Sequence, residues 1–190
     1  MKRLICVTGS SRGIGKSIAL ELNKFYPEQV DFILLARDTT KLTDVRNQIA
    51  NESFGKNRAF TVEIDFSVAM QVADYLQILK ENMPDDQKYD ELIFVYNHGS
   101  LEFGSVSLAA QEALRTKFEI NLFSVWSLCS AVSLLLPTSL IPKQIHVNIS
   151  SGYSNDAHAN WSGQCCSRVA RDMLFKCFAL ENKDIKVEFF

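Results

Sequence analysis

Short apolar runs alternate with amphipathic stretches along the whole chain. The runs are rich in β-branched and aromatic residues, a pattern typical of buried strands. The predicted strands are Leu4–Thr8, Phe32–Ala36, Ala59–Ile64, Leu92–Asn97, Gln144–Ile149 and Ile185–Phe190. This βαβα order predicts an α/β fold: a doubly wound parallel sheet of the Rossmann type, with about six strands and helices on both faces. No repeat or linker interrupts the pattern, so residues 1–190 are expected to form a single domain.

Five helices are expected between these strands. The first spans Ile14–Phe25, the second has Leu42, Val45 and Ile49 on one face, the third has Val72, Leu76 and Leu79, and the last two run from about Gln111 to Leu136 and from about Ser162 to Glu181. The fourth helix is apolar nearly all round, so it needs cover on the side away from the sheet. We expect a homodimer through the fourth and fifth helices; cover by the chain's own fifth helix is the alternative.

Composition narrows the class of partner and of compartment. The chain has 190 residues, 47% of them hydrophobic, and a net charge of −2 without a long basic block, so we expect no nucleic-acid partner. No signal peptide and no membrane-spanning stretch are expected, because the apolar runs are short. The five cysteines are odd in number and lack a C-x-x-C spacing, which predicts no disulfide framework and no metal site. We expect small buried cysteines and a cytoplasmic protein.

A glycine-rich turn follows the first predicted strand and opens the first helix. Its residues are Gly9, Ser10, Ser11, Arg12, Gly13, Ile14 and Gly15. Gly9 and Gly13 allow a tight turn and close approach to an anion, and Gly15 lets the helix pack on the strand. The helix then directs free N–H groups and its positive dipole end at the anion. The turn therefore predicts a site for the pyrophosphate of a dinucleotide.

The end of the second strand indicates which dinucleotide binds. NAD-binding proteins usually place an acidic residue about 20 residues after the glycine turn, to hold the ribose 2′-hydroxyl. Arg37 stands there instead, and Arg12 lies inside the turn. Two guanidinium groups suit a 2′-phosphate, so NADPH is favoured over NADH. Asp38 follows one position later and is the counter-evidence; its alternative role is to cap the next helix.

Asp65 and Phe66 end the third predicted strand, on the side where ligands bind. They are candidates for holding the adenine of the cofactor. Capping the next helix is an equally good role for Asp65.

Four motifs have the spacing of one known family. They are Thr8-Gly9-x-x-x-Gly13-x-Gly15, Asn97-His98-Gly99 after the fourth strand, Asn121 in the fourth helix, and Asn148-Ile149-Ser150-Ser151. Through them the chain resembles the short-chain dehydrogenase/reductase family over essentially its whole length. Within that family it is most similar to the sepiapterin reductase group, through Ser11-Arg12-Gly13, Ala36-Arg37, Trp161, Ala170-Arg171-Asp172-Met173-Leu174-Phe175 and Ala179-Leu180-Glu181. That resemblance implies NADPH-dependent reduction of a pterin side-chain ketone, in tetrahydrobiopterin synthesis.

The resemblance also places two departures in the reactive site. In the family, a serine and a tyrosine thirteen positions later bind the substrate carbonyl. The tyrosine protonates that carbonyl, and a lysine four positions further on holds the nicotinamide ribose. Counting from Ser151 gives Gln164 and Arg168. The implied catalytic residues are thus Asn121, Ser151, Gln164 and Arg168; Ser151, Gly152 and Gln164 would contact substrate, and Asn97 and Arg168 the cofactor.

Gln164 has no proton to give near neutral pH, and losing a positioned general acid typically costs about 10²–10⁴-fold in rate. Arg168 keeps the positive charge with a different geometry. Tyr153, the nearest tyrosine, is expected to cover the pocket from a loop, and His158 is expected to be exposed without a role.

The family continues beyond its sixth strand into a substrate lid. This sequence stops at Phe190, so we expect the substrate segment to be absent and the sixth strand to form an apolar edge. One functional hypothesis is an NADPH-dependent carbonyl reductase acting on a pterin ketone. The alternative is a catalytically impaired NADPH-binding and dimerising module that regulates an active relative. A third possibility is a truncated product that folds poorly.

Overall fold

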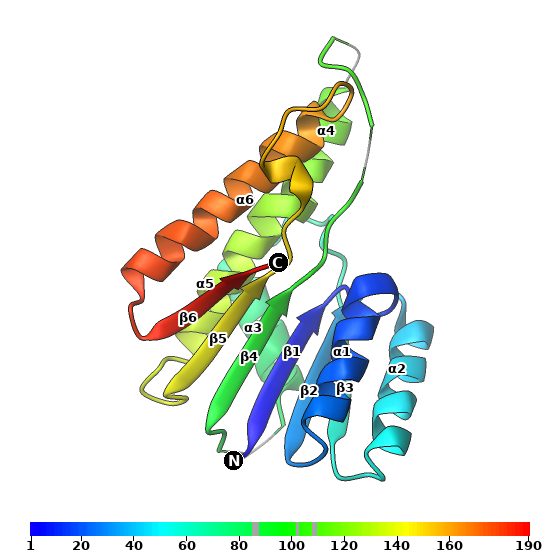
Figure 1. Ribbon diagram of the computed structural model, residues 1–190, viewed down its shortest axis with the longest axis vertical. Coiled ribbons are helices and arrows are strands. Elements are labelled where there is room, and N and C mark those ends of the chain that lie inside the picture. Colours follow the sequence, from blue (N-terminus) through cyan, green and yellow to red (C-terminus); the bar gives the residue numbers. More distant parts are fainter. Residues whose placement is uncertain (85–87, 102, 108–109) are drawn as a thin grey trace.

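The computed structural model describes residues 1–84, 88–101, 103–107 and 110–190. Six parallel strands form one sheet in the order β3-β2-β1-β4-β5-β6 (Figure 1). The strands are β1 (Arg3–Thr8), β2 (Val30–Ala36), β3 (Arg58–Glu63), β4 (Glu91–Tyr96), β5 (Lys143–Asn148) and β6 (Ile185–Phe189). Each lies within two residues of its predicted bounds. The Rossmann-type sheet expected from the sequence is therefore confirmed.

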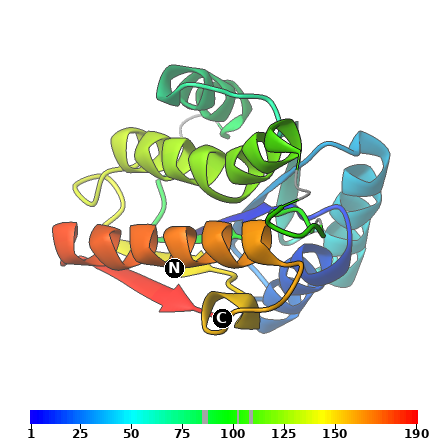
Figure 2. The same cartoon turned by 90° about the horizontal axis from the view of Figure 1, so that it is seen from above.

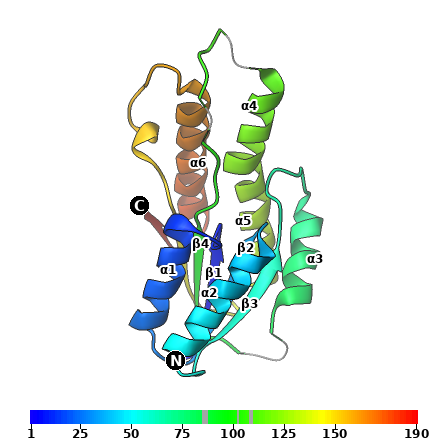
Figure 3. The same cartoon turned by 90° about the vertical axis from the view of Figure 1, so that its right-hand side faces the viewer.

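Helices cover both faces of this sheet. They are α1 (Gly13–Phe25), α2 (Thr39–Glu52), α3 (Val72–Asn82), α4 (Gln111–Phe118), α5 (Ser124–Leu135) and α6 (Ser162–Glu181). On one face α1 and α2 bury Ala19, Leu42, Val45 and Ile49 against the strands. On the other face α3, α5 and α6 form the second core, with α5 beside α6 (Figure 2) and beside α3 (Figure 3).

The direction of winding reverses between β1 and β4. The chain builds β2 and β3 on one side of β1 and then crosses to β4, β5 and β6 on the other side. In open α/β sheets, ligands bind at such a switch point, outside the carboxyl ends of the strands. The glycine turn after β1 and the segment after β4 meet at this edge, which is the upper one in Figure 1.

The predicted fourth helix is interrupted by a wide turn. Between α4 and α5, residues Glu119–Phe123 form a π-helical segment, η1, in which Ser124 N–H donates to the Glu119 carbonyl five residues back. The extra residue in this turn carries Asn121 inward, where it is fully buried. Single π turns inside α-helices are frequently found at functional sites.

The expectation that every apolar run is too short to span a membrane does not hold for this stretch. The segment Gln111–Leu135 is long and apolar enough to cross a membrane by length and composition only, and its most apolar 18 residues have a mean hydropathy of 1.5. The structure gives the reason for this composition. Val125, Leu128 and Val132 are buried in the core, while Trp126 and Leu134 are exposed on the outer side. The apolar residues of this segment thus belong largely to α5, which packs on the sheet and on α3.

The cysteines also differ in part from expectation. All five are free thiols; Cys6 and Cys129 are buried, Cys165 is half-buried, and Cys166 and Cys177 are exposed on α6. The prediction of five buried cysteines is wrong for the three on α6, because that helix turns one side to solvent. Within the described part of the chain, no group of three or more His, Cys, Asp and Glu side chains is arranged to hold a metal ion.

Candidate functional site

The glycine turn has the conformation that its residue types indicate. Gly9 and Gly13 have φ angles of +65° and +55°, in the left-handed region that favours glycine. A Cβ atom at Gly15 would lie 2.4 Å from both the Gly9 carbonyl oxygen and Asn97 Nδ2. A Cβ at Gly13 would meet no atom within 4 Å. The turn is therefore tightly packed underneath and open above.

The first turn of α1 lacks a cap from its own chain. Arg12 is the N-cap residue, with an extended backbone and no side-chain hydrogen bond to the helix. Ser11 is half-buried and Ile14 is exposed, whereas Ser10 is buried and its Oγ has no hydrogen-bond partner among the described residues. The first N–H groups of a helix have no acceptor within it. These donors face the open side of the turn and suit an anion.

Arg37 is held only loosely at the carboxyl end of β2. Its Nη1 lies 3.7 Å from Asp65 Oδ2; the Arg37 side chain is largely exposed, as is Arg12, whereas Asp65 is half-buried. Asp38 has the capping role that the sequence left open: its Oδ1 accepts a hydrogen bond from the Lys41 N–H at 3.0 Å, at the start of α2. Hydrogen bonds from the Lys41 side chain and backbone hold the pKa of Asp38 below its ordinary value.

Asp65 and Phe66 follow β3 but differ in exposure. Asp65 Oδ1 accepts hydrogen bonds from the Ser67 N–H and hydroxyl, and Gln71 caps α3 instead. The proposed capping role of Asp65 is therefore wrong, because the helix begins at Val72, seven residues later. The Phe66 ring is buried and stacks on His98, with centroids 3.7 Å apart. Only the backbone of Phe66 is left for a cofactor to contact.

Asn97 and His98 join β4 to the glycine turn. The backbone N–H groups of both residues donate to Thr8 Oγ1, at 2.8 and 3.1 Å, and Asn97 Nδ2 donates to the Thr8 carbonyl at 3.0 Å. The His98 ring bridges Thr8 Oγ1 and Ser124 Oγ. Burial, with the nearby charges of Arg171 and Arg168, lowers the pKa of His98 well below its ordinary value. The sequence carried no local signal for this buried histidine.

The helix α6 brings the replaced residues into one buried polar cluster. The cluster consists of Asn121, Gln164, Ser167, Arg168 and Arg171, all buried. Asn121 Oδ1 accepts from the Ser100 N–H at 2.8 Å, and its Nδ2 donates to Ser167 Oγ at 3.0 Å. Oriented by its neighbours, the Gln164 amide donates to the Ser100 carbonyl at 2.9 Å and accepts from Arg168 Nε at 3.2 Å. The structure thus brings Asn121, Gln164 and Arg168 together.

Arg168 lies under the loop that follows β4. Its Nη1 donates to the Ile149 carbonyl at 3.2 Å, and a Cβ at Gly99 would lie 2.4 Å from its Nη2. The absent side chain at Gly99 therefore makes room for the guanidinium group. Only 8% of Arg168 is exposed, and this burial lowers its pKa.

Ser151 and the nearest tyrosine lie on a separate loop. Ser151 is half-buried at the start of a short 3₁₀ turn, Gly152–Ser154, and its Oγ accepts a hydrogen bond from the Tyr153 N–H at 3.4 Å. Gly152 is exposed. The Tyr153 ring stacks on Trp161, with centroids 4.2 Å apart. His158 is exposed, as expected from the sequence.

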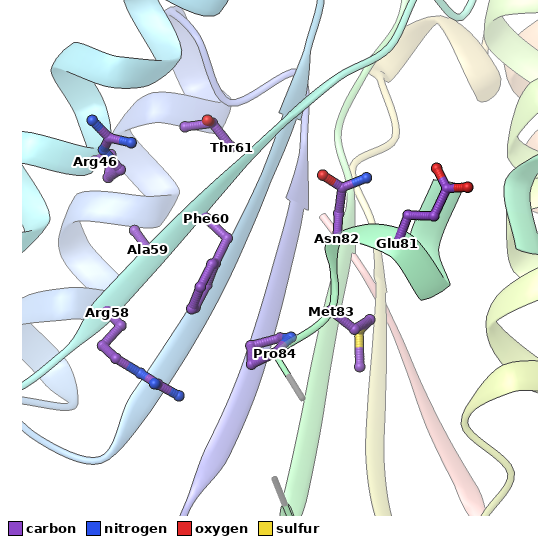
Figure 4. A pocket seen from close by; sticks show the side chains of 9 residues that line it. All are labelled: Arg46, Arg58, Ala59, Phe60, Thr61, Glu81, Asn82, Met83 and Pro84. Carbon is purple, nitrogen blue, oxygen red and sulfur yellow. The ribbon is translucent and has the colours of Figure 1, made fainter. Parts of the chain in front are cut away.

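A separate cavity of about 500 Å³ lies along the outer edge of β3 (Figure 4). Its lining includes Arg46 of α2, Phe60 of β3 and Glu81 at the end of α3. None of the residues that the sequence singled out lines this cavity, so it is distinct from the candidate site.

Comparison with models of known protein families shows to which family the chain belongs. The family model described as short chain dehydrogenase matches residues 3–189. The chain is a short-chain dehydrogenase. It therefore belongs with the oxidoreductases of this family, and the resemblance drawn from its motifs is confirmed.

Relatives of this short-chain dehydrogenase include pterin reductases. Sepiapterin reductase of Rattus norvegicus is 25% identical over 189 residues, which cover 96% of this chain and 71% of the relative. The NADPH-dependent pterin aldehyde reductase of Arabidopsis thaliana is also 25% identical, over 94% of this chain and 69% of the relative.

Solved structures share the fold. A short chain dehydrogenase of Salmonella enterica serovar Typhi superposes with a TM-score of 0.82 at 26% identity, covering 98% of this chain and 73% of that one. A putative short chain dehydrogenase of Shigella flexneri, complexed with NADP, has a TM-score of 0.84 at 24% identity, covering 98% and 75%.

Proposed function

We propose that this short-chain dehydrogenase binds NADPH and reduces the carbonyl group of a pterin-like substrate. The observation that carries the proposal is the uncapped N-terminus of α1, which follows a turn with two left-handed glycines and has Arg12 and Arg37 as exposed cations. The two named relatives act on pterins, and the structure from Shigella flexneri holds NADP. These likenesses support the cofactor and the substrate class.

The residues present fit such a cofactor. The turn offers open space above Gly13 and an unpartnered Ser10 hydroxyl below the helix end. Free N–H groups at the start of α1 would hold the pyrophosphate. Arg37 would exchange its loose contact with Asp65 for the 2′-phosphate, with Arg12 as the second cation. Asn97 and Arg168 would contact the nicotinamide end.

The side chains that would contact the reacting carbonyl are poor proton donors. Bound NADPH would supply the hydride. Ser151 and the amide of Gln164 would donate hydrogen bonds to the carbonyl oxygen, but neither ionises near neutral pH. The proton must then come from water, and the missing acid slows reduction by about 10²–10⁴-fold relative to a tyrosine-containing relative.

A second candidate is an NADPH-binding module without turnover that regulates an active relative. The observation that favours it is the bonding of Gln164, whose amide is engaged on both sides by Ser100 and Arg168. A glutamine held in this way has little freedom to follow a reacting substrate.

Two measurements separate these functions. Fluorescence titration with NADPH tests the cofactor site, and saturation in the micromolar range supports both candidates. Absorbance at saturating NADPH with sepiapterin then tests turnover. A slow but protein-dependent rate supports the reductase; a rate equal to that of heat-denatured protein supports the binding module. Absence of NADPH binding by folded protein overturns both.

We also propose that the protein is a homodimer through α5 and α6. Trp126 is 54% exposed on α5, where Leu134 is also exposed; Phe123 of η1 and Val169 and Met173 of α6 are exposed as well. A second copy would cover this apolar face. In light scattering, Trp126→Glu should convert dimer to monomer. Phe54→Glu, at an exposed aromatic outside these helices, should not. A monomeric wild-type protein would contradict the proposal.

A further inference from the structure

The inward face of α6 changes character along its length. Its C-terminal half buries Phe175 and Phe178, as an amphipathic helix should. Its N-terminal half buries Gln164, Ser167, Arg168 and Arg171. Arg171 is the largest fully buried side chain among the described residues. Arginine is almost never fully buried unless its charge has partners, so its contacts need an explanation.

Every nitrogen of the Arg171 guanidinium group has an oxygen acceptor. Nε donates to Asn148 Oδ1 at 2.6 Å, Nη1 donates to the His98 carbonyl at 2.8 Å, and Nη2 donates to the Tyr96 carbonyl. No carboxylate of the described residues lies within ion-pair distance. Asp172 accepts from Asn148 Nδ2 and Ser150 Oγ instead. Burial lowers the pKa of Arg171 to about 9, so the group is charged at neutral pH.

Two of these three acceptors belong to the residues on either side of Asn97. The Tyr96 and His98 carbonyls point to Arg171, while the N–H groups of Asn97 and His98 point to Thr8 Oγ1. The Asn97 side chain then donates to the Thr8 carbonyl, at the start of the glycine turn. Asn148 ends β5. One guanidinium group therefore joins the carboxyl ends of β4 and β5 and, through Asn97, reaches β1.

We propose that Arg171 is a positioning residue that holds Asn97 against the glycine turn and so sets the affinity for NADPH. The planar fork of donors matches three oxygens that surround it, an arrangement that a lysine ammonium on a flexible stem cannot reproduce. Arg171 itself does not contact the cofactor in this proposal. The inference rests on the proposed NADPH site, but the bonding around Asn97 exists without the cofactor.

The test compares Arg171→Met and Arg171→Lys with a control that weakens the same helix elsewhere. Phe178→Leu is that control, because Phe178 is buried near His146, in the half of α6 away from Asn97. Thermal unfolding measures the loss of stability for each variant. Fluorescence titration measures NADPH affinity, and hydrogen exchange without cofactor measures protection of the Asn97 and His98 amides.

In Arg171→Met, we expect the Kd for NADPH to rise about tenfold or more, equivalent to one lost charge-assisted hydrogen bond. The Asn97 and His98 amides should exchange faster. Arg171→Lys should give a smaller change in the same direction, and it decides the question if the methionine variant does not fold. Phe178→Leu should lower stability without changing Kd or the protection of these two amides.

Two results would overturn the inference: NADPH affinity within twofold of wild type in the folded Arg171 variants, or an equal loss of affinity in Phe178→Leu. If the wild-type protein does not bind NADPH, the proposed function fails. Hydrogen exchange alone then decides whether Arg171 holds Asn97 in place: faster exchange in the Arg171 variants than in Phe178→Leu supports it, and equal exchange rejects it.

Discussion

Nε of Arg168 donates a hydrogen bond of 3.2 Å to the side-chain oxygen of Gln164, one turn earlier on α6. The same amide donates to the Ser100 carbonyl at 2.9 Å, so both of its ends are engaged. The two residues that the family resemblance assigns to the positions of the acid and the lysine are therefore hydrogen-bonded to each other. The pair preserves one positive charge and several hydrogen bonds but provides no proton donor near neutral pH.

Restoring the acid should restore turnover. We expect the double variant Gln164→Tyr with Arg168→Lys to reduce sepiapterin about 10²-fold faster than wild type or more, since a positioned general acid contributes about 10²–10⁴-fold. The measurement is the initial rate at saturating NADPH. The control is Gln164→Phe with Arg168→Lys, which adds the ring without the hydroxyl and should stay slow. Equal rates in the two double variants would show that proton donation does not limit the reaction.

Arg37 should select the phosphorylated cofactor. Its present partner, Asp65, is 3.7 Å away and the Arg37 side chain is largely exposed, so the guanidinium is available to a 2′-phosphate. We expect Arg37→Ala to weaken NADPH binding by about 10–100-fold, the value of a hydrogen bond to a charged group, and to leave NADH binding nearly unchanged. Arg46→Ala removes the same charge from α2, away from the turn, and should alter neither affinity. A parallel loss of NADH affinity in Arg37→Ala would assign Arg37 a different role.

The glycine turn should respond differently at its two glycines. At Gly15 a Cβ would meet the Gly9 carbonyl oxygen and Asn97 Nδ2, so Gly15→Ala should destabilise the fold by about 1–3 kcal/mol through overpacking. At Gly13 a Cβ meets nothing, and only the positive φ is unfavourable, so Gly13→Ala should cost about 1–2 kcal/mol. Urea denaturation measures both, and NADPH titration should show the larger loss at Gly15. A larger loss of stability or of NADPH affinity in Gly13→Ala than in Gly15→Ala would contradict the close packing at Gly15.

Two buried histidines should make the protein sensitive to acid. Burial lowers the pKa of His146 to about 3 and that of His98 well below its ordinary value, whereas unfolded histidine titrates near 6.5. Below pH 6.5 the unfolded state therefore binds more protons, and stability falls by up to about 1.4 kcal/mol per pH unit for each histidine. Denaturation between pH 6.5 and 4.5 measures this slope. His146→Gln should make the slope of stability against pH shallower. An equal change of slope in His158→Gln, at an exposed histidine, would rule out burial as the cause.

The sequence by itself determined the elements and the cofactor edge. Apolar runs and helical faces are local patterns, so the six strands and the bounds of α6 followed from spacing. Gly9, Gly13 and Gly15 followed from backbone requirements that only glycine satisfies cheaply. The segment Gln111–Leu135 shows the limit of such patterns, because an apolar residue in a sequence does not indicate which other surface will bury its side chain.

Only the tertiary structure decided the partners of the polar residues. In the sequence, Arg171 is one more charged residue on a predicted helix. Only in the folded protein do three oxygen atoms at the ends of β4 and β5 accept hydrogen bonds from it. His98 gains its place from Thr8 and Ser124, which are distant in the chain. Asp65 likewise gains a loose contact with Arg37, which follows a different strand. The hydrogen-bond partners of buried groups lie on segments that come together only when the chain folds, so they cannot be predicted from local residue spacing.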